Sequence, residues 1–122
     1  MARPQRSRKI CSEPKYKAFA PLSYTSDEVS DEDVVLSVDE YETIRLIDLI
    51  GLTQEQCAKH MGVSRTTVTE IYDRARHKVA HMLIEGRELI IDGGNYSVCN
   101  GHHPDGAGLC DKCMSLMSGS IK

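Results

Sequence analysis

The sequence predicts an all-α fold: a helix-turn-helix domain of three to four helices, preceded by an irregular arm and followed by a loop-dominated tail rich in Cys and His. Three observations lead to this prediction. Apolar residues recur with helical spacing only between about residues 34 and 92, three of the four prolines precede this range, and Gly, Ser, His and Cys dominate the residues that follow it. We therefore expect an arm and acidic linker at 1–33, the helical domain at 34–92, and a tail at 93–122 that is flexible or stabilised by a metal ion.

The arm is basic although the 122-residue chain has a formal net charge of −3. Residues 1–17 carry six Lys or Arg residues against a single Glu, whereas residues 27–42 carry eight Asp or Glu residues and neither Lys nor Arg. Charges act over a Debye length of about 8 to 10 Å, so the arm can bind a polyanion even in an acidic protein. We interpret the acidic run at 27–33 as a solvated linker that can compete with a polyanion for the arm.

Each predicted helix has a capping residue before it and a breaking signal after it. Ser37 with Glu40 forms the capping pattern of the first helix, which apolar residues continue until Gly51. The two other predicted helices run from Thr53 to about Met61 and from Ser64 to about Glu85, before Gly86. Glu88 to Ile91 is predicted to form a short strand, closed by Asp92-Gly93-Gly94.

The segment AKHMGVSRTTV predicts a tight turn between the second and third helices. Ala58 is small enough to let the two helices cross closely, and Gly62 supplies the positive φ that a turn requires. Val63 and Val68 are expected to fill the space between the helices, with Met61 behind them. This spacing of a small residue, a glycine and apolar residues is typical of a helix-turn-helix.

The exposed face of the third helix carries the candidate DNA-reading residues. Its first turns reach base edges in the major groove when such a unit binds DNA, and the predicted base-reading residues are Arg65, Thr66, Thr69 and Glu70. The predicted phosphate contacts are Arg3, Arg6, Arg8, Lys9, Thr53, Gln54, Ser64, Thr67, Arg74 and Arg76. The alternatives are that these residues solvate an exposed helix, and that the arm increases solubility or binds RNA or acidic proteins.

The same region resembles two known families. DEYETIRLIDLIGLTQEQCAKHMGVSRTTVTEIYDRARHKV is similar to region four of bacterial sigma factors, the part that reads a promoter element. More closely, about residues 1–92 resemble a small prokaryotic family of predicted DNA-binding proteins, domain of unknown function 134, through MARPQRSRKICSEP and VLSVDEYETIRLID. The resemblance implies a DNA-binding regulator without sigma activity, since the other sigma regions are absent. It also implies the base-reading role for the four residues named above.

The tail combines three cysteines and two histidines within fifteen residues. A C-x-x-C pair can bind one metal ion through two thiolates, and another Cys with a His can complete a tetrahedron. The candidate ligands are Cys99, His102, His103, Cys110 and Cys113. One zinc ion is weighed against a disordered tail with incidental thiols and against an iron-sulfur cluster or redox switch.

The remaining Cys and His residues have other expected roles. Cys11 can supply an extra ligand if the arm folds back, and Cys57 is expected to be a small buried apolar residue. His60, His77 and His81 are expected to be surface or packing residues, although the last two stand one helical turn apart, as a zinc-binding pair does.

These patterns together predict a sequence-specific transcriptional regulator that binds double-stranded DNA. Because one such unit reads only a few base pairs, a homodimer on a pseudo-palindromic site is expected. The alternative is a protein-interaction module, for example one that docks on RNA polymerase and is regulated by a metal- or redox-responsive tail. An enzyme is not expected, since no nucleophile–base pair, phosphate loop or general-acid pair is found.

The cellular location is predicted from the lack of a sequence pattern for a membrane span or a signal peptide. No apolar run approaches the roughly 18 residues of a membrane span, and the basic N-terminus is followed by Pro and charged residues rather than a signal-peptide core. We therefore expect a cytoplasmic protein without a membrane partner. Five cysteines without a secretion signal argue against a disulfide framework.

Overall fold

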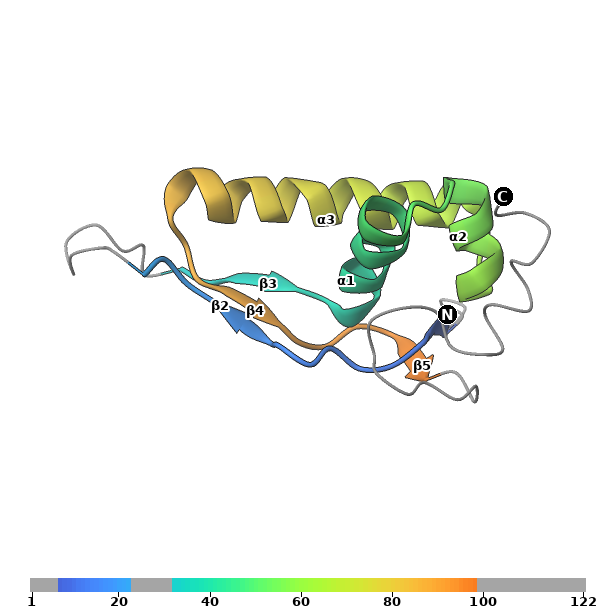
Figure 1. Ribbon diagram of the computed structural model, residues 1–122, viewed down its shortest axis with the longest axis horizontal. Coiled ribbons are helices and arrows are strands. Elements are labelled where there is room, and N and C mark those ends of the chain that lie inside the picture. Colours follow the sequence, from blue (N-terminus) through green and yellow to red (C-terminus); the bar gives the residue numbers. More distant parts are fainter. Residues whose placement is uncertain (1–6, 23–31, 99–122) are drawn as a thin grey trace, which may run out of the picture.

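A computed structural model of the protein describes residues 7–22 and 32–98 (Figure 1). Within these ranges the helices are α1 (Val38–Ile44), α2 (Gln54–Met61) and α3 (Arg65–Glu85), and a π-helical segment, η1 (Arg45–Ile50), continues α1. The strands are β1 (Arg8–Ile10), β2 (Ala18–Phe19), β3 (Val34–Leu36), β4 (Leu89–Ile91) and β5 (Tyr96–Val98). The fold is therefore mixed α/β.

The all-α prediction was wrong because two small sheets complete the fold. β4 is the central strand of a three-stranded sheet, antiparallel to β2 and parallel to β3, and β1 pairs in parallel with β5. The short strand expected at Glu88–Ile91 is confirmed as β4, but β1 and β2 lie in the segment that was expected to be irregular. Strands of two or three residues are too short for a periodicity signal, and their partners are far away in the sequence.

The elements form two layers. α3 runs along the length of the molecule above the sheet of β2, β4 and β3, and α1 packs against α3 (Figure 1). α2 packs across the beginning of α3, and β1 contacts both α1 and α2 at this end of the molecule. Strands from near both ends of the described chain therefore support the helices.

The predicted caps are confirmed at all three helix starts. Ser37 and Glu40 form a reciprocal capping box, as do Thr53 and Gln56, and the Ser64 side chain accepts a hydrogen bond from the Thr67 N–H at 3.1 Å. These bonds satisfy backbone donors that have no partner inside a helix. The helix boundaries could therefore be predicted from local sequence.

Two apolar clusters form the core. The sheet cluster joins both sheets to α1 and α3 through Ile10, Val34, Leu36, Val38, Ala75, Leu89 and Ile91. The turn cluster joins η1, α2 and α3 through Leu46, Leu52, Cys57, Ala58, Met61 and Val68. In the part of the chain that the structure describes, no helix combines the length and the apolar character needed to cross a membrane.

Candidate functional site

The unit of α2, the following turn and α3 has a fixed crossing geometry. Gly62 adopts φ 72° and ψ 33°, and the N–H of Val63 donates to the carbonyl of Ala58 at 3.0 Å. Ala58, Met61 and Val68 are buried between the helices, as the spacing predicted. The turn cluster thus sets the angle at which the first turns of α3 leave the molecule.

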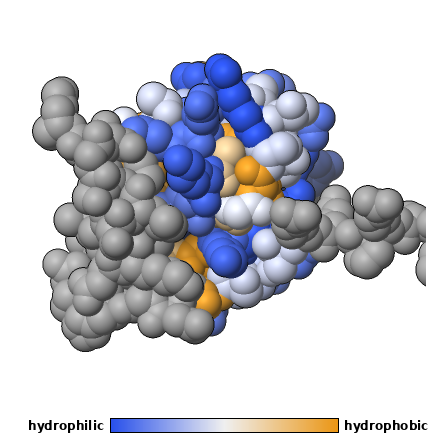
Figure 2. Space-filling view, turned by 90° about the vertical axis from the view of Figure 1, so that its right-hand side faces the viewer, coloured by the Kyte–Doolittle hydropathy of each residue, from blue (hydrophilic) through white to orange (hydrophobic). Residues whose placement is uncertain are grey.

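The first turns of α3 present a polar surface. Arg65, Thr66 and Glu70 are exposed, and the end of the molecule formed by α2 and the start of α3 is largely hydrophilic in Figure 2. Thr69 differs from these three, because its Oγ1 lies 2.5 Å from Oε1 of Gln54 and 3.1 Å from the carbonyl oxygen of Arg65. This contact links α2 to α3 and leaves the Thr69 hydroxyl already engaged within the protein.

Several of the predicted phosphate-contact residues of α2 and α3 are accessible at the surface. Thr53, Ser64 and Thr67 lie at helix starts, where the hydroxyls of Ser64 and Thr67 are 2.9 Å apart. Arg76 is exposed, with its guanidinium carbon 5.3 Å from the centre of the Tyr72 ring. These side chains lie on the surface, where an anion has access to them.

Arg74, by contrast, is engaged by a carboxylate that the sequence analysis placed only in a helix cap. Glu40 is buried, and its two oxygens lie 3.2 Å from Nε of Arg74 and 2.7 Å from Nζ of Lys78. Burial alone would raise the pKa of Glu40, but hydrogen bonds from Lys78, the Ser37 N–H and Arg74, together with the charge of Lys78, lower it below 4.5. Glu40 therefore ties α1 to α3 as a carboxylate.

The arm packs against the α2–α3 turn. The methylene carbons of Lys9 lie next to Gly62, 3.8 Å from the position of a Cβ there, while Lys9 itself is exposed. Arg8 is buried in β1, with Nε 3.8 Å from a carboxylate oxygen of Asp39. Of the predicted arm contacts, Lys9 is thus an exposed cation beside the turn, Arg8 is mostly enclosed, and Arg3 and Arg6 lie outside the described residues.

A buried polar cluster lies where β1, α1 and α2 meet. Glu42 is 0% exposed and accepts two hydrogen bonds from Arg45, at 2.8 Å from Nε and 2.9 Å from Nη2. The Cys11 N–H also donates to Glu42, at 3.1 Å, and Cys11 Sγ lies 3.7 Å from Nε2 of His60. Burial would lower the pKa of Arg45, but Glu42 and then Cys11 raise it above its ordinary value, so the guanidinium is charged.

Three members of this cluster can hold a metal ion. Cys11, Glu42 and His60 each offer one ligand atom, these atoms all lie within 4.8 Å of one another, and all three residues are buried. Cys11 was considered as an extra ligand for the tail, which lies outside the described residues, and Glu42 and His60 were not predicted as ligands. The one signal for Glu42 in the sequence is a carboxylate placed three residues before an arginine, a spacing at which the two side chains of a helix can meet.

The neighbouring thiol has a different environment. Burial, followed by the charge of Glu42, raises the pKa of Cys57 to about 12, and its sulfur lies 3.6 Å from the sulfur of Met61. Cys57 is therefore a protonated, packed thiol, which confirms its predicted role as a small buried residue. The five predicted metal ligands of the tail, Cys99, His102, His103, Cys110 and Cys113, lie outside the described residues.

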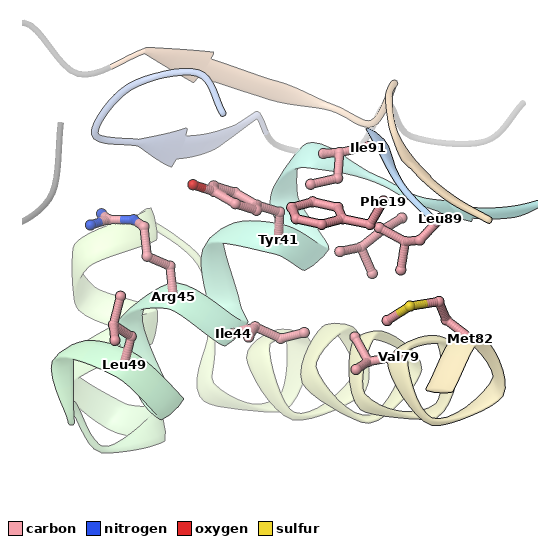
Figure 3. A pocket seen from close by; sticks show the side chains of 10 residues that line it. Phe19, Tyr41, Ile44, Arg45, Leu49, Val79, Met82, Leu89 and Ile91 are labelled. Atoms are coloured by element: carbon pink, nitrogen blue, oxygen red, sulfur yellow. The ribbon is translucent and has the colours of Figure 1, made fainter. Parts of the chain in front are cut away.

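An apolar cavity of about 430 Å³ opens between the sheet, α1 and α3. Phe19, Tyr41 and Leu89 lie along one side of it, and Val79 and Met82 of α3 lie opposite (Figure 3). Burial raises the pKa of the Tyr41 hydroxyl, which therefore stays neutral. The sequence did not predict this cavity, because the residues that line it come from six separate elements: β2, β3, α1, η1, α3 and β4.

Comparisons with known proteins identify relatives along most of the chain. Residues 1–99 match a family described as a protein of unknown function, DUF134. A UPF0251 protein of Desulfitobacterium hafniense (strain Y51) is 50% identical over 101 residues, which are 83% of this chain and 79% of the relative. A UPF0251 protein of Pelotomaculum thermopropionicum is 41% identical over 128 aligned residues, covering 95% of this chain and 96% of the relative.

A UPF0251 protein of Chlorobaculum tepidum is 40% identical over 98% of this chain, but the match covers only 59% of that relative. No solved structure matches the chain. The resemblance inferred from the arm and from the first helix is thus confirmed at the level of the family. The chain belongs to the DUF134 family, which includes the UPF0251 proteins.

Proposed function

We propose that this protein is a sequence-specific DNA-binding transcriptional regulator that inserts the first turns of α3 into the major groove. The observation that carries the proposal is the exposed set of Arg65, Thr66 and Glu70 at the start of a helix whose angle is set by a buried helix–turn–helix crossing. The major groove is about 12 Å wide and accepts an α-helix in this manner. A helix-turn-helix similar to sigma region four, as the sequence predicts, would orient α3 in the same way.

The surroundings of α3 supply the electrostatic part of binding. Lys9 stands beside the turn, and Thr53 and Ser64 cap the two helices whose free backbone N–H groups attract phosphate. Such contacts are independent of sequence and steeply dependent on salt. Net charge −3 does not oppose this mode, because six of the fifteen basic residues are gathered in residues 1–17 against a single Glu.

The internal contacts of two residues refine the assignment of roles. Thr69 is hydrogen-bonded to Gln54, and Arg74 forms an ion pair with Glu40. Both residues therefore act mainly in packing α3 against the neighbouring helices. We therefore assign base reading chiefly to Arg65 and Thr66. Glu70 is suited to accept from a cytosine amino group.

The proposed regulator acts as a homodimer and holds one zinc ion through the Cys and His residues of its tail. A single unit reads only a few base pairs, which favours two copies on a pseudo-palindromic site. Leu83 and Ile84 at the far end of α3 are 68% and 84% exposed, and they are candidates for a contact between copies. Zinc is favoured over iron because both candidate ligand sets mix thiol and imidazole groups.

Selection of bound sequences from a random DNA pool, followed by fluorescence anisotropy on the selected site, tests the proposal. Arg65→Ala should weaken binding by about 1–3 kcal/mol, which is roughly 5- to 150-fold, and relax the preference at one base pair. Arg87→Ala is the matched control, because it removes an arginine just beyond the opposite end of α3. No enrichment of any sequence, or equal losses in the two variants, would contradict groove reading by α3.

A protein-interaction module, for example one that docks on RNA polymerase, is the second candidate. The apolar cavity favours it, because Phe19 and Leu49 line the cavity and are also exposed to solvent. Salt separates the two functions, since DNA binding should weaken steeply between low and moderate salt, whereas docking through an apolar surface should not.

A further inference from the structure

We propose that Cys11, Glu42 and His60 form a buried site for a divalent zinc-type ion that joins the basic arm to the α2–α3 unit. The site is distinct from the cysteines of the tail and uses one residue each from the end of β1, from α1 and from α2. Its three ligand types, thiolate, carboxylate and imidazole, are those that zinc takes in proteins.

The distance between the sulfur and nitrogen atoms fits a shared metal ion as well as it fits a hydrogen bond. Zinc binds sulfur at about 2.3 Å and imidazole nitrogen at about 2.0–2.1 Å, so these two atoms lie about 3.6 Å apart on one tetrahedral ion. Sγ of Cys11 and Nε2 of His60 are 3.7 Å apart. The two residues are 49 positions apart in the chain, so the fold and not local sequence brings the atoms to this separation.

His60 provides a second, independent observation. It is only 4% exposed, yet its Nδ1 has no hydrogen-bond partner among the described residues. A buried nitrogen without a partner is unfavourable, and such atoms in folded proteins generally have a reason. An ion at this cluster would give Nδ1 a partner only by binding that nitrogen, whereas an ion bound through Nε2 would leave the Nδ1–H to be satisfied by a further group.

Charge sets the expected strength of the site. Without an ion, Arg45 balances Glu42, and Cys11 is a neutral thiol when protonated. When a divalent ion binds, the thiol loses its proton to solvent, and the sum of the ion, two anionic ligands and Arg45 is one positive charge. Such an excess is costly in a buried position, so the ion should be exchangeable rather than a permanent structural zinc.

The neighbouring Cys57 is not part of the group of ligand atoms that lie within 4.8 Å of one another, and its sulfur packs 3.6 Å from that of Met61. Among residues 7–22 and 32–98, three protein ligands leave one position open, as in sites that exchange small ligands. The consequence for regulation rests on the proposed function: an ion at Cys11 would hold β1, and with it Lys9, against the turn at Gly62. Ion occupancy would then strengthen DNA binding by pre-organising the arm.

Cobalt titration of the full chain tests the site without DNA. The tail thiols are first removed by Cys99→Ser/Cys110→Ser/Cys113→Ser, and Co²⁺ is added while thiolate-to-cobalt charge-transfer absorption is recorded. This band should saturate at one ion per chain, disappear with Cys11→Ser and weaken by about tenfold or more with His60→Gln. Cys57→Ser, the matched buried-thiol control, should leave it unchanged.

The site would be overturned by absence of the band in the tail variant, by its survival in Cys11→Ser, or by equal loss in Cys57→Ser. If Cys11→Ser fails to fold, His60→Gln carries the test, together with a rise in melting temperature on addition of Zn²⁺ to the tail variant.

The effect of the ion on DNA binding is measured separately. Zn²⁺ should raise the DNA affinity of the tail variant several-fold but not that of the same variant with Cys11→Ser. Unchanged affinity would overturn that consequence alone, and absence of DNA binding under every condition would overturn the proposed function while the cobalt result stands.

Discussion

The two apolar clusters of this protein are assembled in different ways. Every buried member of the turn cluster lies between residues 46 and 68, whereas the sheet cluster draws residues from Ile10 to Ile91. Contacts that are close in sequence cost little loop-closure entropy, and distant ones cost more. The comparison indicates that the core of the proposed DNA-reading unit is encoded locally. The sheet cluster, by contrast, depends on segments from most of the described chain.

Glu42 lies on α1 and Arg45 on η1, between the residues that these helices contribute to the two clusters. Substitution of Glu42 is expected to have the largest effect, and it tests whether the clusters are linked. Glu42→Ala leaves Arg45 buried without its bidentate partner, so the free energy of unfolding should fall by about 3–5 kcal/mol. Urea denaturation in the presence of a chelator measures this loss. Glu55→Ala, at an exposed position of α2, should change stability by no more than about 0.5 kcal/mol. A similarly small effect of Glu42→Ala would mean that the buried pair does not link the clusters.

Leu89→Ala and Met61→Ala compare the clusters directly. Both side chains are buried, and each truncation should cost about 2–5 kcal/mol through lost burial and the cavity left behind. Hydrogen exchange then shows where protection is lost. We expect Leu89→Ala to act mainly on β3 and β4, and Met61→Ala mainly on α2 and the start of α3. Identical exchange maps would show that the two clusters open as one unit.

Gly62 tests how strongly the turn itself is encoded. An Ala there would meet only the Lys9 side chain, at 3.8 Å, so the expected cost of about 1–2 kcal/mol is conformational and comes from the positive φ of 72°. Gly62→Asn should cost less, since Asn tolerates this conformation better. Thermal unfolding of both variants measures the difference, and an Ala variant as stable as the Asn variant would contradict the explanation.

Glu40 provides the smallest expected effect and a dependence on pH. Its pKa in the folded protein lies below 4.5, so its contribution to stability is complete above about pH 4.5 and is lost as the pH falls through the folded-state pKa. Glu40→Gln should therefore flatten the decline of stability in acid, measured by urea denaturation from neutral pH to pH about 3. Arg74 and Lys78 both contact Glu40, and an acid profile unchanged by Glu40→Gln would show that these ion pairs contribute nothing measurable.

Local sequence predicted the parts of the site that depend on short-range chemistry. The caps at Ser37, Thr53 and Ser64 and the turn at Gly62 follow from hydrogen bonds and φ angles within four residues. The engagement of Thr69 by Gln54 could not be predicted in this way, because it depends on how α2 lies across α3. The same holds for the two ion pairs of Glu40 with α3.

What the sequence by itself determined is the set of three helices, the turn between α2 and α3, and the polar residues exposed at the start of α3. What only the tertiary structure decided is the pairing of β1 with β5, the sheet of β2, β4 and β3, and the meeting of Cys11, Glu42 and His60. The physical reason is the distance along the chain between the residues that interact. Helix caps and tight turns are stabilised by neighbours in the chain, whereas parallel strands and buried polar clusters form only after distant segments have paid the entropy of coming together.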